Sequence, residues 1–148
     1  MSDDYEDLTT CSLTPELEAR LLHLQRECVF MWTNSDGEAF GVVMAVLPKD
    51  GRFWLTAAER RKRIAALRRF PRASLCFNST GTKMGPGKTI SYKGTCTVHT
   101  DRATKDWFCP EFSRWLHRDE TAAAEFQKFL DSPHRVVIEF VPDYSLSF

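Results

Sequence analysis

The sequence predicts a mainly β fold: a six-stranded antiparallel sheet, curved or barrel-like, with short helices at its connections. Three observations predict it: short segments rich in β-branched and aromatic residues, turn signals between them, and helical patterns only between the expected strands. A small antiparallel sheet with helices only at its connections buries its apolar face by curling on itself. The expected strands are 28–34, 38–47, 52–56, 72–79, 89–100 and 135–141.

The chain length suits one domain. It has 148 residues, 43% of them hydrophobic, which is enough for a sizeable core. Residues 1–13 are acidic and polar without periodicity, so we expect a flexible N-terminal arm followed by a single domain over 14–148. Its first element should be a helix, because Thr14 can cap it and Pro15 suits the first helical position.

The region 101–131 is predicted to be helical. Asp101 is a good N-cap, the helix should be interrupted at Pro110, and a second segment covers 120–131. We expect the second segment to turn its apolar side chains toward the core, namely Phe126, Phe129 and Leu130.

The stretch 55–69 carries six Arg and Lys side chains, although the formal net charge of the chain is zero. Thr56 and Glu59 match a capping box, so a helix should begin directly after a strand and end before Pro71. Cations in the first turns are unfavourable by roughly 0.3–1 kcal/mol each, because the positive end of the helix dipole repels them. A phosphate held by free N–H groups, the Thr56 hydroxyl and two or three of these cations would offset that cost.

Two other interpretations of the basic stretch stay open. Runs of basic residues usually form a solvated helix face, here with Ile64 and Leu67 toward the core. A nucleic-acid site over 60–69 is the third interpretation, but the chain has no second basic patch and no interleaved aromatic platform. The position at a strand-to-helix junction favours phosphate.

Composition argues against several classes of protein. Balanced charge gives no overall field for nucleic acid or an anionic membrane, and no apolar run approaches the ~20 residues that span a bilayer. The five cysteines include no C-x-x-C pair and the N-terminus lacks signal-peptide features, so we expect a reduced, cytoplasmic protein. The histidines have no metal-ligand spacing, so we expect no metal.

The glycine-rich stretch 81–89 looks like a P-loop but has the wrong spacing. One residue too many separates Gly81 from Gly87, and Lys88 and Thr89 open a strand pattern instead of a helix. We expect a hairpin loop that could act as a mobile rim, with Lys83 or Lys88 able to meet a ligand.

Three segments together resemble the pyridoxamine 5′-phosphate oxidase-like family of flavin-binding split β-barrels. They are DGRFWLTAAERRKRIAALRRFPRASLCF (50–77), GKTISYKGTCTVHTD (87–101) and the short WFCP (107–110), within a similarity that spans roughly 20–141. The succession of strand, Thr, basic helix start, AAL helix, PR and strand is the most specific part. The resemblance implies a six-stranded split β-barrel.

The resemblance also implies a set of phosphate ligands. In such proteins the flavin phosphate is held by the Thr after the strand and by an Arg/Lys pair at the helix start. These positions correspond to Thr56 and two of Arg61, Lys62 and Arg63. The loop before the pair is one residue longer here, so Lys62 and Arg63 are the preferred match and Arg61 a possible substitute.

Ring-binding positions follow from the same resemblance. Val43, Met44 and Ala45 correspond to the strand that lines the isoalloxazine ring, with backbone groups toward its pyrimidine edge. Lys88 and Thr89 correspond to the start of a second lining strand, from which Lys88 could stabilise negative charge near N1 of the reduced ring.

A homodimer is predicted, because the short strands carry many large apolar residues and the family places its flavin at the subunit boundary. Lys88, Thr89 and Trp107 would then reach a cofactor whose phosphate the other chain holds. For Trp107 the alternative of plain helix packing stays open.

The function predicted from the resemblance is an FMN-binding oxidoreductase that acts on a small molecule. The strand over 40–47 lacks the basic residues of the true oxidase, and the chain stops at Phe148 without that enzyme's C-terminal extension, so vitamin B6 oxidation is not predicted. Short-form relatives use FMN or the deazaflavin F420. The alternative is a non-catalytic flavin- or F420-binding protein, a carrier or stress-response module.

Overall fold

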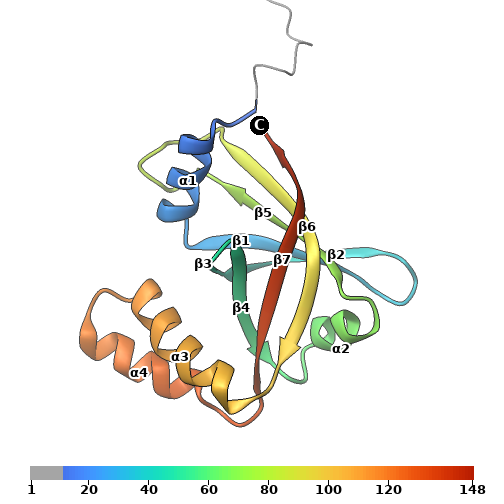
Figure 1. Ribbon diagram of the computed structural model, residues 1–148, viewed down its shortest axis with the longest axis vertical. Helices are drawn as coiled ribbons and strands as arrows, with labels where there is room; N and C mark the ends of the chain where they lie inside the picture. The colour runs from blue at the N-terminus through green and yellow to red at the C-terminus, as the bar shows by residue number, and fades with distance from the viewer. Residues whose placement is uncertain (1–11) are drawn as a thin grey trace, which may run out of the picture.

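The computed structural model describes residues 12–148. Seven strands form a strongly curled sheet, with α1 at the upper left, α2 at the lower right, and α3 and α4 together at the lower left (Figure 1). The strands are β1 (Glu27–Thr33), β2 (Ala39–Ala45), β3 (Leu47–Lys49), β4 (Arg52–Ala58), β5 (Arg72–Asn78), β6 (Thr89–His99) and β7 (Arg135–Ser147). The helices are α1 (Pro15–Leu24), α2 (Lys62–Arg69), α3 (Arg102–Leu116) and α4 (Glu120–Leu130).

All strand pairs are antiparallel, in the order β2-β1-β5-β6-β7-β4-β3, which confirms the predicted fold class. The seventh strand exists because the predicted strand 38–47 bends at Val46. Residues before the bend pair with β1 and residues after it pair with β4. Val46 is fully buried, and its N–H donates to the carbonyl of Arg26 at 3.0 Å. The two edge strands are therefore consecutive in the chain, and the sheet curls into a half-barrel.

The concave face of the sheet holds the main core. Side chains such as Phe77, Ile138 and Phe140 point into it and are fully buried. α2 closes one end of the curl by inserting Ile64 and Leu67 into the same cluster. Along β4, β5 and β6 buried residues alternate with more exposed ones, at the two-residue period that a half-buried sheet requires.

The convex surface around β3, β4 and β7 is covered by α3 and α4, and we call it the covered face. Phe108 and Phe112 of α3 stack with ring centroids 4.8 Å apart. Together with Leu130 of α4 they pack against Leu47 and Val137 of the sheet. This second cluster fixes the α3–α4 hairpin on the half-barrel.

The convex surface across β2, β1, β5, β6 and β7 is the open face, because no helix among the described residues covers it (Figure 1). The strand register places one row of side chains across it, namely Val43, Val29, Cys76, Ser91 and Leu146. Val43 is 65% exposed and Leu146 66% exposed. Large apolar side chains are thus left in solvent on this face of the chain.

The helical region 101–131 differs from the prediction at Pro110. The expected N-cap is present, because Thr104 N–H donates to Asp101 Oδ2 at 2.9 Å, but α3 continues through Pro110 without interruption. Phe108 and Phe112 are buried on either side of the proline. Their packing on the sheet outweighs the backbone hydrogen bond that Pro110 cannot make.

One predicted core residue of α4 lies at the surface. Leu130 is buried and Phe126 half-buried, as expected, but Phe129 is 58% exposed. The helical period places Phe126 and Leu130 on the same side and Phe129 beside them. Its ring instead supports the guanidinium of Arg135, whose carbon lies 4.8 Å from the ring centroid.

The first helix begins as predicted, whereas the capping box of the basic helix does not form. Thr14 caps α1, since its hydroxyl accepts from Leu17 N–H at 3.2 Å. α2 begins only at Lys62, with Arg61 as an N-cap that makes no side-chain hydrogen bond. The expected capping residue Thr56 remains in β4, because the ladder with β7 continues past it. Long-range strand pairing has overridden the local signal.

β7 runs to Ser147, past the predicted end before Pro142. A bulge between Lys93 and Gly94 of β6 absorbs the irregularity, and Gly94 lies opposite Pro142. A Cβ at Gly94 would lie 2.3 Å from the carbonyl oxygen of Val141, so only glycine fits. This gives a physical reason for the glycine at position 94.

Most of the predicted N-terminal arm, 1–13, lies outside the described residues. Leu13 packs against the main core, and its N–H donates to Ser147 Oγ at 2.9 Å. Defined contacts therefore begin one residue before the predicted boundary at 14.

Candidate phosphate-binding site

The cations of α2 and of the turn before it divide into groups with different surroundings. Arg68 is neutralised, because its guanidinium donates to both carboxylate oxygens of Glu59. This pair fits the solvated-face interpretation. Lys62 and Arg69 instead line a hollow between α2 and the β1–β2 turn. Neither forms an ion pair within residues 12–148.

The charges of Arg61 and of a third cation, Arg135, both act on Arg63, and the charge of Arg61 acts on Arg135. Ala58, the last residue of β4, lies opposite Arg135 in the ladder with β7. Its carbonyl accepts from Arg61 N–H at 3.0 Å, which holds the turn beside the start of β7. Arg63 follows in the first turn of α2 and is half-buried. We call Arg61, Arg63 and Arg135 the arginine cluster.

The arginine cluster has unmet hydrogen-bonding capacity. The Nε atoms of Arg63 and Arg135 are buried and have no hydrogen-bond partner among the described residues. Burial lowers the pKa of the Arg63 guanidinium, and the charges of Arg61 and Arg135 act in the same direction. Burial likewise lowers the pKa of Arg135. Within residues 12–148, no carboxylate lies at ion-pair distance from any of the three. An anion would supply both the missing acceptor and the missing charge.

Arg135 is the functional candidate that sequence reasoning missed. It stands at the start of the last strand, far along the chain from the basic run, so no local spacing connects the two. The signal that could have found it is topological: pairing of the third predicted strand with the last one puts Arg135 opposite the end of the former.

Thr56 lies close to the cluster in the chain, but its hydroxyl is already used. Its Oγ1 donates to the carbonyl of Val136 at 2.7 Å. A hydroxyl has one hydrogen to donate. In this arrangement Thr56 has no hydrogen left for a phosphate oxygen, which is itself an acceptor.

The predicted ring-binding strand is the edge strand β2, which is paired only with β1. Val43 points to the open face, Met44 is buried in the main core, and Ala45 packs beside the covered-face cluster. Met44 thus points to the concave side of β2, and Val43 and Ala45 point to the convex side. What they share is a backbone edge without a strand partner in the described structure, and the use of their backbone groups for the ring stays a prediction.

Lys88 and Thr89 lie far from the arginine cluster within one chain. The glycine loop is a hairpin connection as predicted, since Ser79 N–H donates to the carbonyl of Lys88 at 2.9 Å. Thr89 and Phe148 exchange backbone hydrogen bonds of 2.9 and 2.8 Å at the far end of β7. The 13 residues of β7, at ~3.3 Å each, separate this end from Arg135 by up to roughly 40 Å along the strand. One chain does not bring these predicted residues together.

Trp107 lies on α3 against the sheet. Its ring meets that of Trp54 edge-on, with centroids 4.6 Å apart, and Lys49 Nζ lies 4.9 Å above it. Both aromatic rings belong to the edge of the covered-face cluster. The sequence leaves two roles open for Trp107, contact with the cofactor and plain helix packing. Packing accounts for the contacts seen within one chain.

Cys109 of α3 has no features of a nucleophile. Burial raises the pKa of its thiol, and Asp131 raises it further, although Lys105 and two arginines oppose the shift. A protonated, buried thiol is inert.

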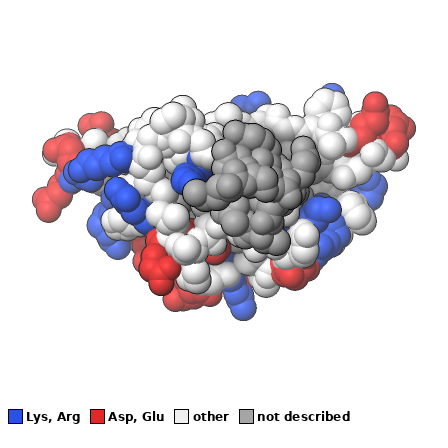
Figure 2. Space-filling view, turned by 90° about the horizontal axis from the view of Figure 1, so that it is seen from above, with Lys and Arg blue, Asp and Glu red and all other residues white. Residues whose placement is uncertain are grey.

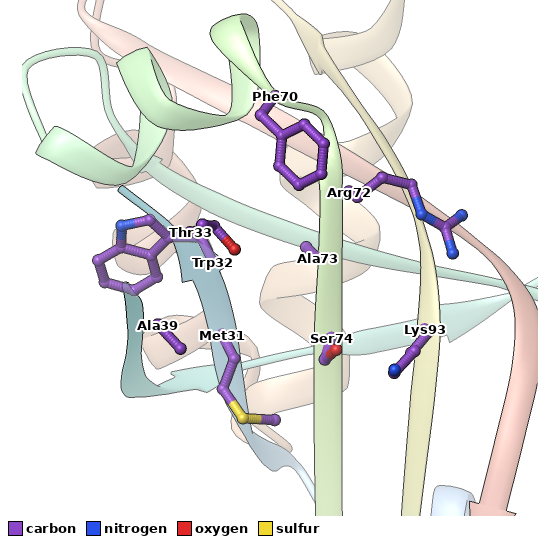
Figure 3. Close-up of a pocket in the computed structure, with 9 residues that line it drawn as sticks. All are labelled: Met31, Trp32, Thr33, Ala39, Phe70, Arg72, Ala73, Ser74 and Lys93. Carbon is purple, nitrogen blue, oxygen red and sulfur yellow. The ribbon is translucent and has the colours of Figure 1, made fainter. Parts of the chain in front are cut away.

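A shallow hollow on the open face adds a second kind of surface. Figure 3 shows Lys93 pointing toward Ser74 between β5 and β6, while Phe70 hangs over the upper end of the hollow. Arg72 turns the other way and pairs with Asp143. Of the two cations that line this hollow, Lys93 is therefore the one whose side chain points into it.

Charge elsewhere is mixed. Seen from the end that holds the C-terminus, basic and acidic side chains intersperse around the periphery of the described surface (Figure 2). No described helix is long and apolar enough to cross a membrane. In the same part of the chain no three His, Cys, Asp or Glu side chains are grouped as metal ligands.

A curled antiparallel half-barrel, with α2 closing one end and an arginine cluster beside it, defines a split β-barrel with a candidate anion site. The family model described as Pyridoxamine 5′-phosphate oxidase matches residues 13–145. The chain therefore belongs to the pyridoxamine 5′-phosphate oxidase-like family, as the resemblance predicted.

Solved structures share this fold at low sequence identity. The conserved hypothetical protein Rv2991 from Mycobacterium tuberculosis is similar with a TM-score of 0.77 and 17% identity, over 93% of this chain and 86% of the other. A protein named F420 Reductase is similar with a TM-score of 0.67 and 13% identity, over 86% of this chain and 94% of the other. A FAD-binding protein from Mesorhizobium loti is similar with a TM-score of 0.65 and 15% identity, over 92% of this chain and 94% of the other. No curated protein matches significantly.

Proposed function

We propose that the chain binds a phosphate-bearing flavin or deazaflavin through the arginine cluster and uses it in redox chemistry on a small molecule. The observation that carries the proposal is the pair of buried, unpartnered Nε atoms on Arg63 and Arg135. A guanidinium whose charge is partly desolvated and unpaired is unfavourable alone and well suited to a phosphate.

Arg61, Arg63 and Arg135 are the residues that would hold the phosphate. This choice keeps Arg63 from the sequence prediction, uses its substitute Arg61 in place of Lys62, and adds Arg135. The unpaired backbone edge of β2 at Val43 and Ala45 would meet the ring. When bound, a flavin supplies hydride or electron transfer, and the protein's task is to position it and adjust its electronics.

The choice of cofactor is proposed as FMN, with F420 as the alternative. FMN follows from the family resemblance, and the structural neighbours named F420 Reductase and FAD-binding protein show that this fold accommodates other flavin-type cofactors. FMN, F420 and FAD should therefore be titrated side by side.

The experiment compares Arg63→Gln, Arg135→Gln and the double variant with the wild type by flavin fluorescence quenching. Loss of one charge-assisted hydrogen bond to phosphate should weaken binding about tenfold to a hundredfold. Arg20→Gln, an exposed cation on α1, is the matched control and should bind as wild type does. Unchanged affinity in the double variant would return the cluster to a structural role.

Redox function is tested separately from binding. Protein saturated with FMN is reduced by NAD(P)H, and protein saturated with F420 by reduced F420, followed by reoxidation with quinones and conjugated carbonyl compounds. Turnover faster than free cofactor supports an oxidoreductase. Tight binding without turnover would favour the alternative, a non-catalytic carrier or stress-response module.

We also propose a homodimer, formed through the open face. The support is the exposure of Val43 and Leu146 on the open face, together with the separation of Lys88 and Thr89 from the arginine cluster. A second chain is the simplest way to bring those residues to one cofactor. Light scattering at micromolar concentration should give the mass of a dimer, and a monomer would refute the proposal.

A further inference from the structure

The hollow between α2 and the β1–β2 turn, which Lys62 and Arg69 line, is distinct from the arginine cluster. It has a volume of about 430 Å³, which falls within the range of small-molecule pockets. Trp32, Phe40 and Asn34 line one side, and Lys62 and Arg69 line the other. We call it the aromatic pocket.

The aromatic wall of this pocket is a stack that ends in solvent. Phe30, Trp32 and Phe40 follow one another with centroid separations of 6.1 and 6.0 Å and interplanar angles of 26° and 20°. Phe30 is fully buried, whereas Phe40 is 53% exposed. Figure 3 shows the Trp32 ring turned away from Ser74 and Lys93 of the neighbouring hollow. The stack therefore presents aromatic surface to a further planar ring.

The opposite wall is cationic and unpaired. Lys62 and Arg69 are seven residues apart on α2, about two helical turns, so they lie on the same side of the helix. Two acidic residues stand nearby in the β1–β2 turn, Asp36 and Glu38, and Glu38 accepts from Asn34 Nδ2 at 3.3 Å. Neither carboxylate pairs with Lys62 or Arg69 in the described structure.

We propose that the aromatic pocket binds a small planar aromatic carboxylate. Its ring would continue the stack of Trp32 and Phe40, and its carboxylate would lie against Arg69 and Lys62. Arg69 is the stronger candidate for specificity, because a guanidinium can bind a carboxylate with two parallel hydrogen bonds. The site involves neither Arg63 nor Arg135, which the proposed function assigns to the flavin phosphate, but it uses Lys62, which the family resemblance gives as a phosphate ligand. Competition with FMN therefore distinguishes the two uses of Lys62.

The test uses 2-naphthoate as the probe and its uncharged amide, 2-naphthamide, as the matched ligand. Calorimetric titration gives affinity, and the indole N–H signals of ¹⁵N-labelled protein, assigned with Trp32→Phe, locate binding. Naphthoate should bind saturably, shift the Trp32 signal and bind more tightly than the amide. Saturating FMN should not displace it.

The variants separate ring from charge. Arg69→Gln should weaken naphthoate about tenfold, as expected for loss of a charge-assisted contact, and leave the amide unchanged. Phe40→Leu should weaken both ligands about equally. Arg63→Gln and Phe129→Leu, a cluster residue and an exposed aromatic residue elsewhere, are controls that should change neither.

Three results would overturn the proposal. They are no saturable binding of naphthoate, equal affinity for acid and amide, and unchanged affinity in Arg69→Gln with a folded spectrum. If naphthoate fails to bind and Phe40→Leu instead changes the molar mass in light scattering, the aromatic stack is part of a contact between two copies of the chain.

Discussion

The covered and open faces belong to the same curved sheet, yet the chain treats them differently. On the covered face the α3–α4 hairpin buries Phe108 and Phe112 completely. On the open face Val43 and Leu146 remain mostly exposed. Among the described residues, helices of the chain bury only one of the two convex surfaces. We therefore expect a second copy of the chain to cover the open face.

The largest expected effect is on the covered face. Phe112→Ala should lower the free energy of unfolding by about 3–5 kcal/mol, because it leaves a cavity between α3 and the sheet. Urea denaturation of the dissociated chain, at a concentration where light scattering gives the monomer mass, measures it. Met31→Ala, a half-buried residue of β1 on the open face, is the comparison and should cost much less. Equal losses would mean that the two faces are packed alike.

The second effect contrasts two strand glycines. Gly94→Ala should cost about 3 kcal/mol, since its Cβ would press on the Val141 carbonyl and the Phe140 ring at 2.3 and 2.8 Å. Gly41→Ala on β2 should cost clearly less, because its nearest neighbours, 3.2 Å away, are side-chain atoms of Met31 and Val29 that can move. Thermal unfolding of both variants decides it. A tolerated alanine at Gly94 would show that the bulge relaxes.

A smaller, pH-dependent effect is expected where the two faces meet. Glu139 is bound by Arg52 and by His99 Nε2, the latter at 2.8 Å. Burial raises the pKa of Glu139, but these two partners outweigh burial and hold it below its usual value. The stabilisation is therefore present above the unfolded pKa of about 4.3 and is lost as pH falls through the folded value.

The variant Glu139→Gln tests this dependence. At pH 7 it should be less stable than wild type by about 1.5 kcal/mol, through loss of hydrogen bonds to a charged group. The difference should shrink as pH falls toward 3, and urea denaturation at both pH values measures it. A difference that does not change with pH would mean that the carboxylate charge contributes nothing.

The smallest effect on the fold is expected on the open face. Leu146→Lys should change the unfolding free energy of the dissociated chain by less than about 0.5 kcal/mol, since the side chain is already in solvent. The same variant should halve the molar mass found by light scattering, because it places a charge in the proposed dimer contact. An unchanged mass would move the contact elsewhere.

Part of the prediction that rested on local patterns was accurate. The strand segments, the Thr14 and Asp101 caps and the hairpin at the glycine loop follow from residue periodicity and turn chemistry, and the structure confirms them. The basic stretch was rightly singled out, and its position after β4 is as expected. Its helix start was wrong, because the ladder between β4 and β7 keeps Thr56 in the strand.

The sequence by itself determined the mainly β class, the family and the presence of a localised group of cations, because each depends on residues that are neighbours in the chain. Only the tertiary structure decided how those cations are used. Pairing of β4 with β7 brings Arg135 to Arg61 and Arg63, while the turn of α2 sends Lys62 and Arg69 to the aromatic pocket. Such arrangements depend on residues distant in sequence that meet in the fold and on what packs near each side of a helix, and no local pattern specifies either.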